Sequence, residues 1–438
     1  MEIGIFASVN DAIGFVRNAH DRYQTLSLED RYEIIEAIRG KLLEQADVIA
    51  MLALEETGMG NFADKKTKLI AAITNTPGVE DLITEVKTGD RGMTLYELSA
   101  FGVICTIEPV TSPAASLVNH VISMVAAGNA VVICPNPRAL KTTKYVTSLI
   151  SNTILDVCGI DNLVVSLDES SIDKVQEVMH HPDVDMIVCN AGEAALRGAF
   201  SCGKKVIGEG QSKSVVLVDE TADLNAAAFD ISVSASFDNN LIHSSEKAVV
   251  VVKDVKEELA KAFARNKTHV ITSQDEVARL TSLLLRPDNT LKRKWIGKSA
   301  ASILDAAGIA HAGDVRLILA ETDCQHPLAT EELRTPVLSY VCADSYKQGL
   351  QMILDIEQRY KHTAAIHSTD INRLSEAARV LQTAVFVKNG PALSGVGLVI
   401  PNSPFTLTVA NTTGEGAVSA RHFARRRKCI LTNGFSIR

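Results

Sequence analysis

Cysteine thiolates can act as nucleophiles or as metal ligands, and this chain contains eight cysteines. They are scattered through the sequence at positions 105, 134, 158, 189, 202, 324, 342 and 429. No two of them have C-x-x-C spacing, which excludes a zinc knuckle and a thioredoxin-type pair, and we expect no metal site. Most lie in apolar runs typical of strands. They are therefore expected to be buried, reduced thiols of an intracellular protein.

A glycine-containing segment points to a second kind of chemistry, the binding of a nucleotide. Gly208-Glu209-Gly210-Gln211-Ser212-Lys213 starts the G-x-G-x-x-G pattern of dinucleotide-binding loops but lacks its third glycine. The segment is therefore either part of a cofactor site or a plain turn between two domains. The residues themselves leave both interpretations open.

Short apolar runs alternate with helical segments from residue 101 onwards, which predicts parallel strands in a doubly wound α/β fold. In a first block we expect strands at 102–107, 130–134, 163–166, 186–189 and 206–207. In a second block, after a boundary near 208–213, we expect them at 215–218, 248–252, 269–272, 316–320 and 385–387. Ligands of such sheets bind at the carboxyl ends of the strands. Upstream, Ser27-Leu28-Glu29-Asp30 resembles a capping box that opens a helix.

Several long motifs follow one another in a fixed order along nearly the whole chain. They are Glu55-Glu56-Thr57-Gly58-Met59-Gly60, Phe101-Gly102-Val103-Ile104, Ala126-Ala127-Gly128-Asn129, Val218-Asp219-Glu220-Thr221-Ala222-Asp223, Ser236-Phe237-Asp238-Asn239-Asn240, Gly297-Lys298-Ser299-Ala300, Lys388-Asn389-Gly390-Pro391, Thr413-Gly414-Glu415-Gly416 and Asn433-Gly434-Phe435-Ser436-Ile437-Arg438. In these motifs the chain resembles the CoA-acylating aldehyde dehydrogenases of ethanolamine and propanediol metabolism, which convert an aldehyde, NAD and coenzyme A into an acyl-CoA.

The resemblance implies an aldehyde dehydrogenase-like α/β fold with three parts. Residues 1–212 are expected to form a Rossmann-type cofactor domain, in which 86–100 is an oligomerisation strand region. Residues 213–400 are expected to form an α/β catalytic-type domain. Residues 401–438 are expected to form a C-terminal return that completes a small β-hairpin oligomerisation element.

The nucleophile of that family is a cysteine that lies three residues after the Phe-Asp-Asn-Asn run, and here this position is His243. No cysteine lies between Cys202 and Cys324. A thiolate suits the family reaction because it attacks the aldehyde carbonyl and later leaves the thioester. An imidazole can be a nucleophile or a general base, so hydrolytic chemistry at His243 is one interpretation and simple filling of the vacated position is the other.

Other positions that face a ligand in the family also differ in this chain. Ser112 stands where an asparagine amide helps to hold the oxyanion, and loss of such a donor typically costs ~10²–10³ in rate. The resemblance places the cofactor at the remaining positions, namely Pro135, Asn136, Pro137, Ala191, Gly192, Gly208, Gly210 and Glu332. Glu332 corresponds to a carboxylate that binds a ribose, with a surface acid as the alternative. His362 and His367 match family histidines that serve equally well for packing or for ligands.

Two classes of function follow from this comparison. The first is an oxidoreductase that uses NAD, coenzyme A and a small aldehyde, with altered chemistry at His243 and little or no acylating activity. The second is a non-catalytic paralogue that binds a nucleotide or pairs with an active homologue. The substitution of the cysteine favours the second class as far as chemistry is concerned.

The overall charge and hydropathy bear on whether the protein binds nucleic acid, enters a membrane or is secreted. The formal net charge is −8, from 44 basic and 52 acidic residues, which argues against a nucleic-acid surface. The sequence pattern predicts no membrane span and no signal peptide, so we expect a cytoplasmic protein. We also expect a homodimer or a dimer of dimers, formed through an edge strand at 94–99 and the segment 421–438.

Overall fold

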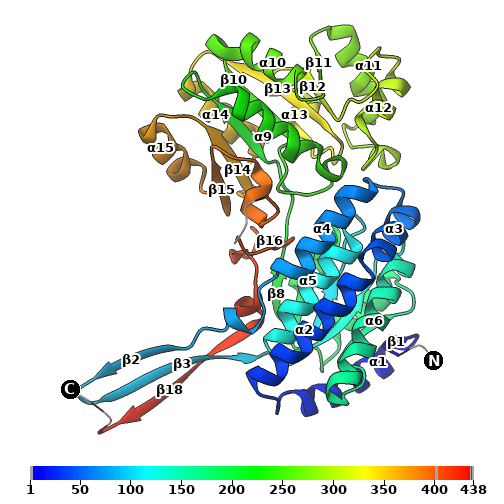
Figure 1. The fold of residues 1–438 in the computed structure, drawn as a ribbon, viewed down its shortest axis with the longest axis vertical. Helices are drawn as coiled ribbons and strands as arrows, with labels where there is room; N and C mark the ends of the chain where they lie inside the picture. The colour runs from blue at the N-terminus through cyan, green and yellow to red at the C-terminus, as the bar shows by residue number, and fades with distance from the viewer. Residues whose placement is uncertain (1–2, 400–402, 435, 437–438) are drawn as a thin grey trace.

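Two parallel β-sheets, each covered by helices, form the two lobes of the molecule, as the computed structural model shows (Figure 1). The structure describes residues 3–399, 403–434 and 436. The blue to teal lobe is built from the first half of the chain, and the green to orange lobe from the second half (Figure 1). The predicted α/β class is therefore confirmed. No helix in the described part of the chain combines the length and the apolar character that a membrane crossing requires.

The first sheet has the strand order β1-β6-β5-β4-β7-β8, and all of its strands are parallel. The strands are β1 (Ile5–Phe6), β4 (Val103–Ile107), β5 (Ala130–Cys134), β6 (Val164–Leu167), β7 (Met186–Cys189) and β8 (Lys205–Gly208). Helices cover both faces, so the central strands β4 and β5 are fully buried and, apart from Thr106, apolar. The helices are α1 (Val9–Tyr23), α2 (Leu28–Glu44), α3 (Ala46–Thr57), α4 (Phe62–Asn75), α5 (Pro113–Ala126), α6 (Leu140–Cys158), α7 (Ile172–His180) and α8 (Glu193–Ser201). The predicted capping box is confirmed, because Ser27 and Asp30 bond reciprocally at the start of α2.

The second sheet is also parallel and has the order β11-β12-β13-β10-β9-β14-β15. Its strands are β9 (Val215–Val218), β10 (Ala248–Val252), β11 (Thr268–Ile271), β12 (Leu317–Glu321), β13 (Val337–Ala343), β14 (Thr363–His367) and β15 (Val385–Lys388). Its helices are α9 (Leu224–Ser236), α10 (Lys256–Ala264), α11 (Gln274–Leu284), α12 (Ala300–Ala307), α13 (Pro327–Thr330), α14 (Tyr346–Glu357) and α15 (Ile371–Leu381). The sequence pattern did not predict β13 and β14. In β14 the two central alanines have low strand propensity, and burial between neighbouring strands decides the conformation.

A three-stranded antiparallel ribbon projects from the first lobe (Figure 1). It consists of β2 (Glu85–Gly89), β3 (Gly92–Ala100) and β18 (Ala424–Thr432), with β3 in the centre. The prediction that residues 94–99 form an edge strand is therefore wrong for 94–96, which pair with both β2 and β18, whereas 97–99 pair with β18 alone. The free edges belong to β2 and β18. Arg421 anchors the ribbon to the lobe through Asp81, to which its Nε donates over 2.8 Å.

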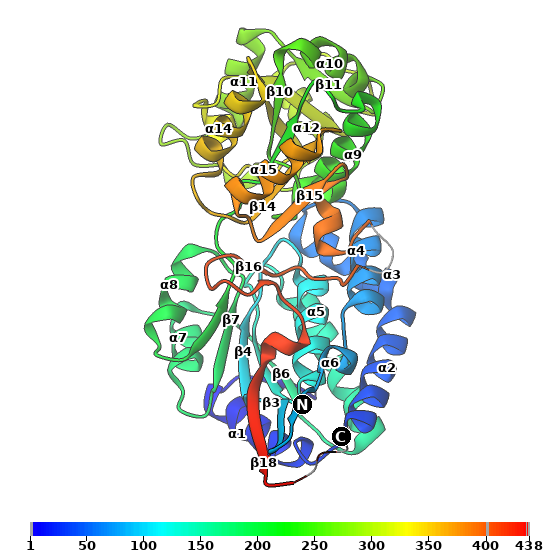
Figure 2. The ribbon, with the colours of Figure 1, turned by 90° about the vertical axis from the view of Figure 1, so that its left-hand side faces the viewer.

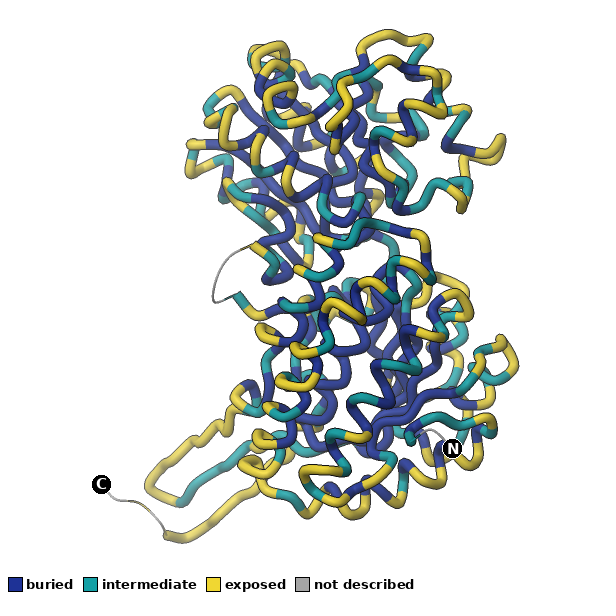
Figure 3. The backbone as a smooth tube through the Cα atoms, turned by 45° about the vertical axis from the view of Figure 1, so that its right-hand side comes forward, coloured by how far each residue is buried: buried dark blue, intermediate teal, exposed yellow. Residues whose placement is uncertain are grey.

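The segment between β15 and β18 runs along the boundary between the lobes (Figure 2). It includes the short strands β16 (Val409–Ala410) and β17 (Gly416–Ala417) and the 3₁₀ turns η5 (Ala392–Val396) and η6 (Ala420–Phe423). Figure 3 shows buried backbone at the centre of each lobe and exposed backbone along most of the ribbon. The family-like end of the chain at 433–438 lies only partly within the described residues.

Candidate active site

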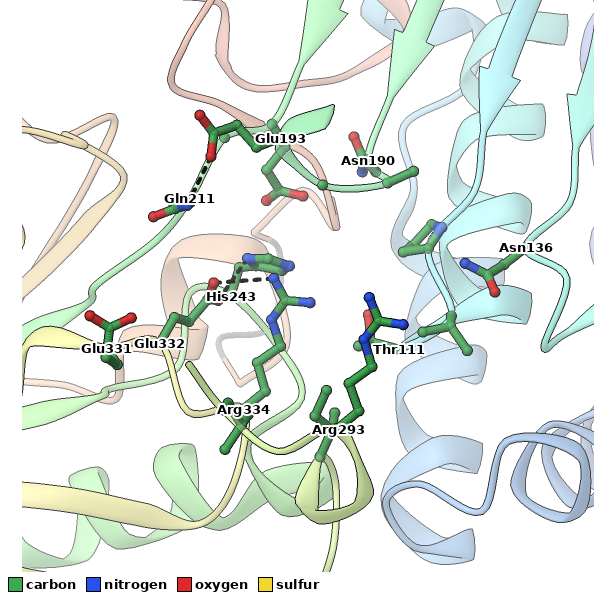
Figure 4. Close-up of a pocket in the computed structure, with 18 residues that line it drawn as sticks. Thr111, Asn136, Asn190, Glu193, Gln211, His243, Arg293, Glu331, Glu332 and Arg334 are labelled. Atoms are coloured by element: carbon green, nitrogen blue, oxygen red, sulfur yellow. Dashed lines mark hydrogen bonds and ion pairs between the residues drawn. The ribbon is translucent and has the colours of Figure 1, made fainter. Parts of the chain in front are cut away.

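A cavity of about 350 Å³ lies between the two lobes. The first lobe contributes the loops that follow β4, β5, β7 and β8, as expected for the carboxyl ends of parallel strands. The second lobe contributes His243, the 3₁₀ turn η4 (Arg293–Trp295) and the segment before β13 (Figure 4). The lining residues are Pro109, Val110, Thr111, Asn136, Asn190, Ala191, Gly192, Glu193, Glu209, Gly210, Gln211, His243, Leu291, Arg293, Ile296, Glu331, Glu332 and Arg334.

His243 presents one edge of its ring to this cavity and the other to a carboxylate. Its Nδ1 lies 3.0 Å from Oε1 of Glu332, an ion-pair distance. Both atoms are buried, and the contact between them lacks the geometry of a hydrogen bond. Its Nε2 has no hydrogen-bond partner in the described part of the chain, and the side chain is 19 % exposed. In Figure 4, Glu332 lies on one side of the ring, while Asn136 and Thr111 lie across the cavity on the other. The prediction that His243 faces a cleft between the lobes agrees with this position.

Glu332 is held in place by cations as well as by His243. Nη2 of Arg334 lies 3.2 Å from its Oε2. Burial alone would raise the pKa of Glu332, but Arg334, His243 and Lys247 outweigh this and hold that pKa well below its usual range. Glu332 therefore stays ionised, and both of its oxygens already have neighbours within the protein.

A second acid–histidine pair lies close to the first. Nε2 of His362 lies 3.0 Å from Oε1 of Glu209, and the His362 and His243 rings have centroids 6.2 Å apart. Burial would raise the pKa of Glu209, but His243 and His362 lower it below its ordinary value. His362 is fully buried, so it supports the wall of the site behind the cavity. His367, the other family histidine, is buried and does not line the cavity.

The loop that carries His243 has an unusual backbone. The 3₁₀ turn η2 (Phe237–Asn240) contains three successive left-handed residues, with φ of +46°, +54° and +64° at 238–240. Lys247 holds the end of this turn, because its Nζ donates to the carbonyl of Ile242 over 2.9 Å and also bonds Asn240. Burial lowers the pKa of Lys247 to about 8. The turn fixes where the backbone of His243 begins, and hence where its ring lies.

Ser112 does not line the cavity, although its neighbour Thr111 does. The Ser112 side chain is buried, and its Oγ accepts a hydrogen bond from Nζ of Lys68 over 2.7 Å. The Lys68 bond uses a lone pair of Oγ and leaves the hydroxyl proton available, but the side chain would have to turn toward the cavity to donate to a carbonyl bound there. The structure thus gives the predicted oxyanion position a structural contact instead.

The other predicted ligand positions divide into two groups. Asn136, Ala191, Gly192, Gly210 and Glu332 line the cavity. Pro135, Pro137 and Gly208 lie beside it without lining it. Gly208 is a packing position, because a Cβ there would collide with the side chain of Leu196.

Sequence reasoning missed the two arginines of the cavity. Arg293 and Arg334 come from separate segments of the second lobe, and Figure 4 shows both guanidinium groups directed into the space beside His243. Arg293 has no acidic partner in the described ranges 3–399, 403–434 and 436. One sequence signal was available, since Arg334 follows the predicted ligand Glu332 by two residues.

The donor set of the cavity does not fit the diphosphate of a nicotinamide dinucleotide. Four carboxylates line it, those of Glu193, Glu209, Glu331 and Glu332, against two guanidinium groups. Glu193 is the first residue of α8, and its carboxylate pairs with Arg197 and accepts from Gln211, which adds negative charge beside the positive end of that helix. In α6 the amides of Lys141 and Thr142 donate to the carboxylate of Glu56 over 2.8 Å, so these donors are engaged within the protein.

Known proteins resemble this chain over nearly its whole length. Residues 6–401 match the profile described as the aldehyde dehydrogenase family. A propanal dehydrogenase (CoA-propanoylating) of Salmonella typhimurium is 42% identical over 437 residues, which cover 99% of this chain and 93% of that protein. An acetaldehyde dehydrogenase (acetylating), EutE, of the same organism is 36% identical over 442 residues, with 100% and 94% covered. The crystal structure of Rhodopseudomonas palustris propionaldehyde dehydrogenase with bound propionyl-CoA superposes with a TM-score of 0.97 at 37% identity, covering 99% and 96% of the two chains.

Proposed function

Because the chain belongs to the aldehyde dehydrogenase family, with CoA-acylating propanal and acetaldehyde dehydrogenases among its relatives, we propose that it is a member that has lost thiol-dependent oxidation. One observation carries the proposal. His243 takes the position that the resemblance gives to the nucleophile, its ring borders the cavity, and no cysteine is among the described residues that line it. A thiolate both attacks the carbonyl and leaves the thioester, and an imidazole serves neither role well.

The ligands of the relatives bear on which molecules the cavity of this chain accepts. A small aldehyde, or the acyl and thiol end of an acyl-CoA, suits a space of about 350 Å³. We assign residues 1–212 to the lobe that would carry a nucleotide, 213–400 to the lobe that carries His243, and 401–438 to the return segment. NAD is expected to bind weakly, because the Glu193 carboxylate at the start of α8 opposes its diphosphate. A calorimetric titration with NAD measures this directly.

We expect negligible NADH formation from propanal or acetaldehyde with NAD and coenzyme A, followed by absorbance. The single substitution His243→Cys is expected to recover little, and His243→Cys with Ser112→Asn to recover more, since residues that act as one unit are not additive. In the natural protein Lys68 donates to Ser112. The double variant tests whether an asparagine at position 112 can direct its amide into the cavity instead of toward Lys68. Turnover of the natural protein in the range of ordinary enzymes, roughly 1–10³ per second, would contradict the proposal.

Self-association is proposed through the free edges of the ribbon. β2 and β18 are the outer strands of the ribbon in the described part of the chain, and Ile430, Leu431 and Val86 expose apolar surface on them. Such edges suit a second copy of the chain, as a homodimer or a dimer of dimers, or an active homologue with a similar ribbon. Light scattering at micromolar concentration is expected to give a mass above 47.1 kDa. A monomer at every concentration would refute this assembly.

The cytoplasmic location stays a prediction.

A further inference from the structure

We propose that His243 and Glu332 make this cavity a hydrolytic site for esters and thioesters of small acyl groups. The inference rests on the proposed function, because it assumes that the chemistry at this position no longer depends on a thiol. His243 would act as the general base toward water, and Glu332 would be a positioning residue. Arg334 would stabilise the oxyanion.

The arrangement of the His243 ring supports the role of a base. Nδ1 lies 3.0 Å from the ionised Glu332 in an ion-pair contact without hydrogen-bond geometry, and the negative charge on this side favours the ring proton on this nitrogen. The lone pair then resides on Nε2, which has no partner among the described residues and borders the cavity. Glu332 is itself fixed by Arg334 and is only 9 % exposed, so the carboxylate cannot easily turn away. This is the order of groups that general-base catalysis requires, with a base oriented by a third residue.

The positive charges of the cavity lie where a carbonyl oxygen would be stabilised. Arg334 uses one guanidinium nitrogen for Glu332, and a guanidinium offers five N–H donors in all. Arg293 has no acidic partner among the described residues, and its guanidinium points into the same space (Figure 4). Donors held in place before the reaction lower the cost of a developing oxyanion. Ser112 is not needed for this role.

The proposed step balances without any oxidant. Water attacks the acyl carbon while Nε2 of His243 takes one of its protons, so a C–O bond forms and the carbonyl electrons move to the oxygen beside Arg334. The tetrahedral intermediate then collapses and the bond to the leaving oxygen or sulfur breaks. The imidazolium returns its proton to that leaving group. The products are a carboxylic acid and an alcohol or thiol, and nothing is oxidised or reduced.

The groups of the cavity suit the hydrolysis of an ester or thioester better than the oxidation of an aldehyde. Oxidation of an aldehyde needs a hydride acceptor, whereas hydrolysis needs only water, a base and oxyanion donors. The ring of His243 lies 3.0 Å from the Glu332 carboxylate, a negative charge that attracts the imidazolium formed during the step. An acyl thioester without a nucleotide has no phosphate, so the Glu193 carboxylate at the start of α8 does not repel it.

The test uses the whole purified protein and three probes. These are p-nitrophenyl acetate, S-propionyl-N-acetylcysteamine and propionyl-CoA. The absorbance of p-nitrophenolate reports the first, and a colorimetric thiol reagent reports the other two. We expect hydrolysis of the first two, and the comparison of the last two reports whether the nucleotide part helps or hinders. His243→Ala is expected to lose about 10²–10⁴ of the rate, the usual contribution of a general base. Glu332→Gln is expected to lower kcat with little change in KM.

Further readouts separate catalysis from structure. His180→Ala, at an exposed position on α7, should keep the natural rate and serves as the matched control. Thermal melting of each variant reports whether it folds, and His243→Gln supplies a second substitution of similar polarity. The reaction should be slower in D₂O, and mass spectrometry of the protein during turnover should show no acyl adduct.

Four outcomes would overturn the inference or one of the residue roles in it. Equal rates for the natural protein and both His243 variants would remove His243 from the reaction, and an acyl adduct on His243 would make it a nucleophile instead of a base. Natural rates in Glu332→Gln would refute the positioning role. NADH formation is measured on the same preparations. No NADH and no hydrolysis leaves the loss of oxidation standing and refutes the hydrolytic site, whereas NADH formation refutes the proposed function itself.

Discussion

Replacing Asp238 by asparagine is expected to lower the free energy of unfolding by about 3–5 kcal/mol, the usual cost of removing one partner from a buried ion pair. The Asp238 side chain is fully buried, and its Oδ2 lies 2.6 Å from Nζ of Lys68 and 3.3 Å from Nζ of Lys65. Both lysine side chains are almost completely buried, at 2 % and 4 % exposure. Asparagine keeps the shape but leaves both ammonium groups without their counter-charge.

The same carboxylate also holds the turn that carries His243. Its Oδ1 accepts from the amide of Asn61 over 3.1 Å, and the Asp238 amide donates to Asp64 over 2.9 Å, so the turn is tied to α4 of the other lobe. Burial lowers the pKa of Lys65 to about 8 despite the favourable effect of Asp238. Without that charge, Lys65 would lose its proton more readily. The strained backbone at 238–240, with three successive positive φ angles, would then lose part of the ion-pair energy that stabilises it.

Unfolding by urea, followed by circular dichroism, measures this effect. Asp47→Asn is the matched control, because Asp47 and Lys66 form an ion pair of the same kind at 2.5 Å in the adjoining helices. That pair is exposed, at 65 % and 38 %, and its loss should cost less than about 1 kcal/mol. If both variants unfolded at the same urea concentration, the buried cluster would not be the tie between the lobes.

The order of strands and helices could be read from the sequence wherever a strand is apolar throughout. β4, β5, β9 and β10 are runs of valine, isoleucine and similar residues, and burial on both faces produces this pattern. The ribbon was only half predicted. Alternating polarity identifies β3 as a strand, but its pairing with β18 joins residues more than 300 positions apart, and no local pattern records such a contact.

The site could be predicted in position but not in its contacts. The resemblance placed His243 and Glu332, and their proximity follows from the fold. It did not indicate that Glu332 contacts His243, because in that comparison the carboxylate is assigned to a ribose. Arg334 and the Glu209–His362 pair were not foreseen as parts of one network, since these side chains come from segments far apart in the chain. The orientation of Ser112 toward Lys68 depends on α4, which sequence spacing alone does not place.

Replacing His367 by leucine should make the free energy of unfolding fall less as the pH is lowered from 7 to 4. His367 is 3 % exposed, its Nε2 has no partner, and burial lowers its pKa from 6.5 to about 4. A pKa lower in the folded than in the unfolded state contributes stability that is present above pH 6.5 and is lost as the pH falls through 4. At about 1.4 kcal/mol for each pH unit, this loss amounts to about 3 kcal/mol between pH 7 and 4.

Glu246 acts in the opposite direction over nearly the same range. Burial raises its pKa from 4.5 to about 7, so its contribution is present below pH 4.5 and is lost as the pH rises through 7. In the natural protein the two effects largely cancel, whereas in His367→Leu only that of Glu246 remains. Relative to the natural protein, the variant should therefore gain about 3 kcal/mol between pH 7 and 4, measured by urea unfolding at a series of pH values. His180→Leu, at an exposed position, should follow the natural curve. Parallel curves for His367→Leu and the natural protein would show that His367 takes up its proton equally well in the folded and unfolded states.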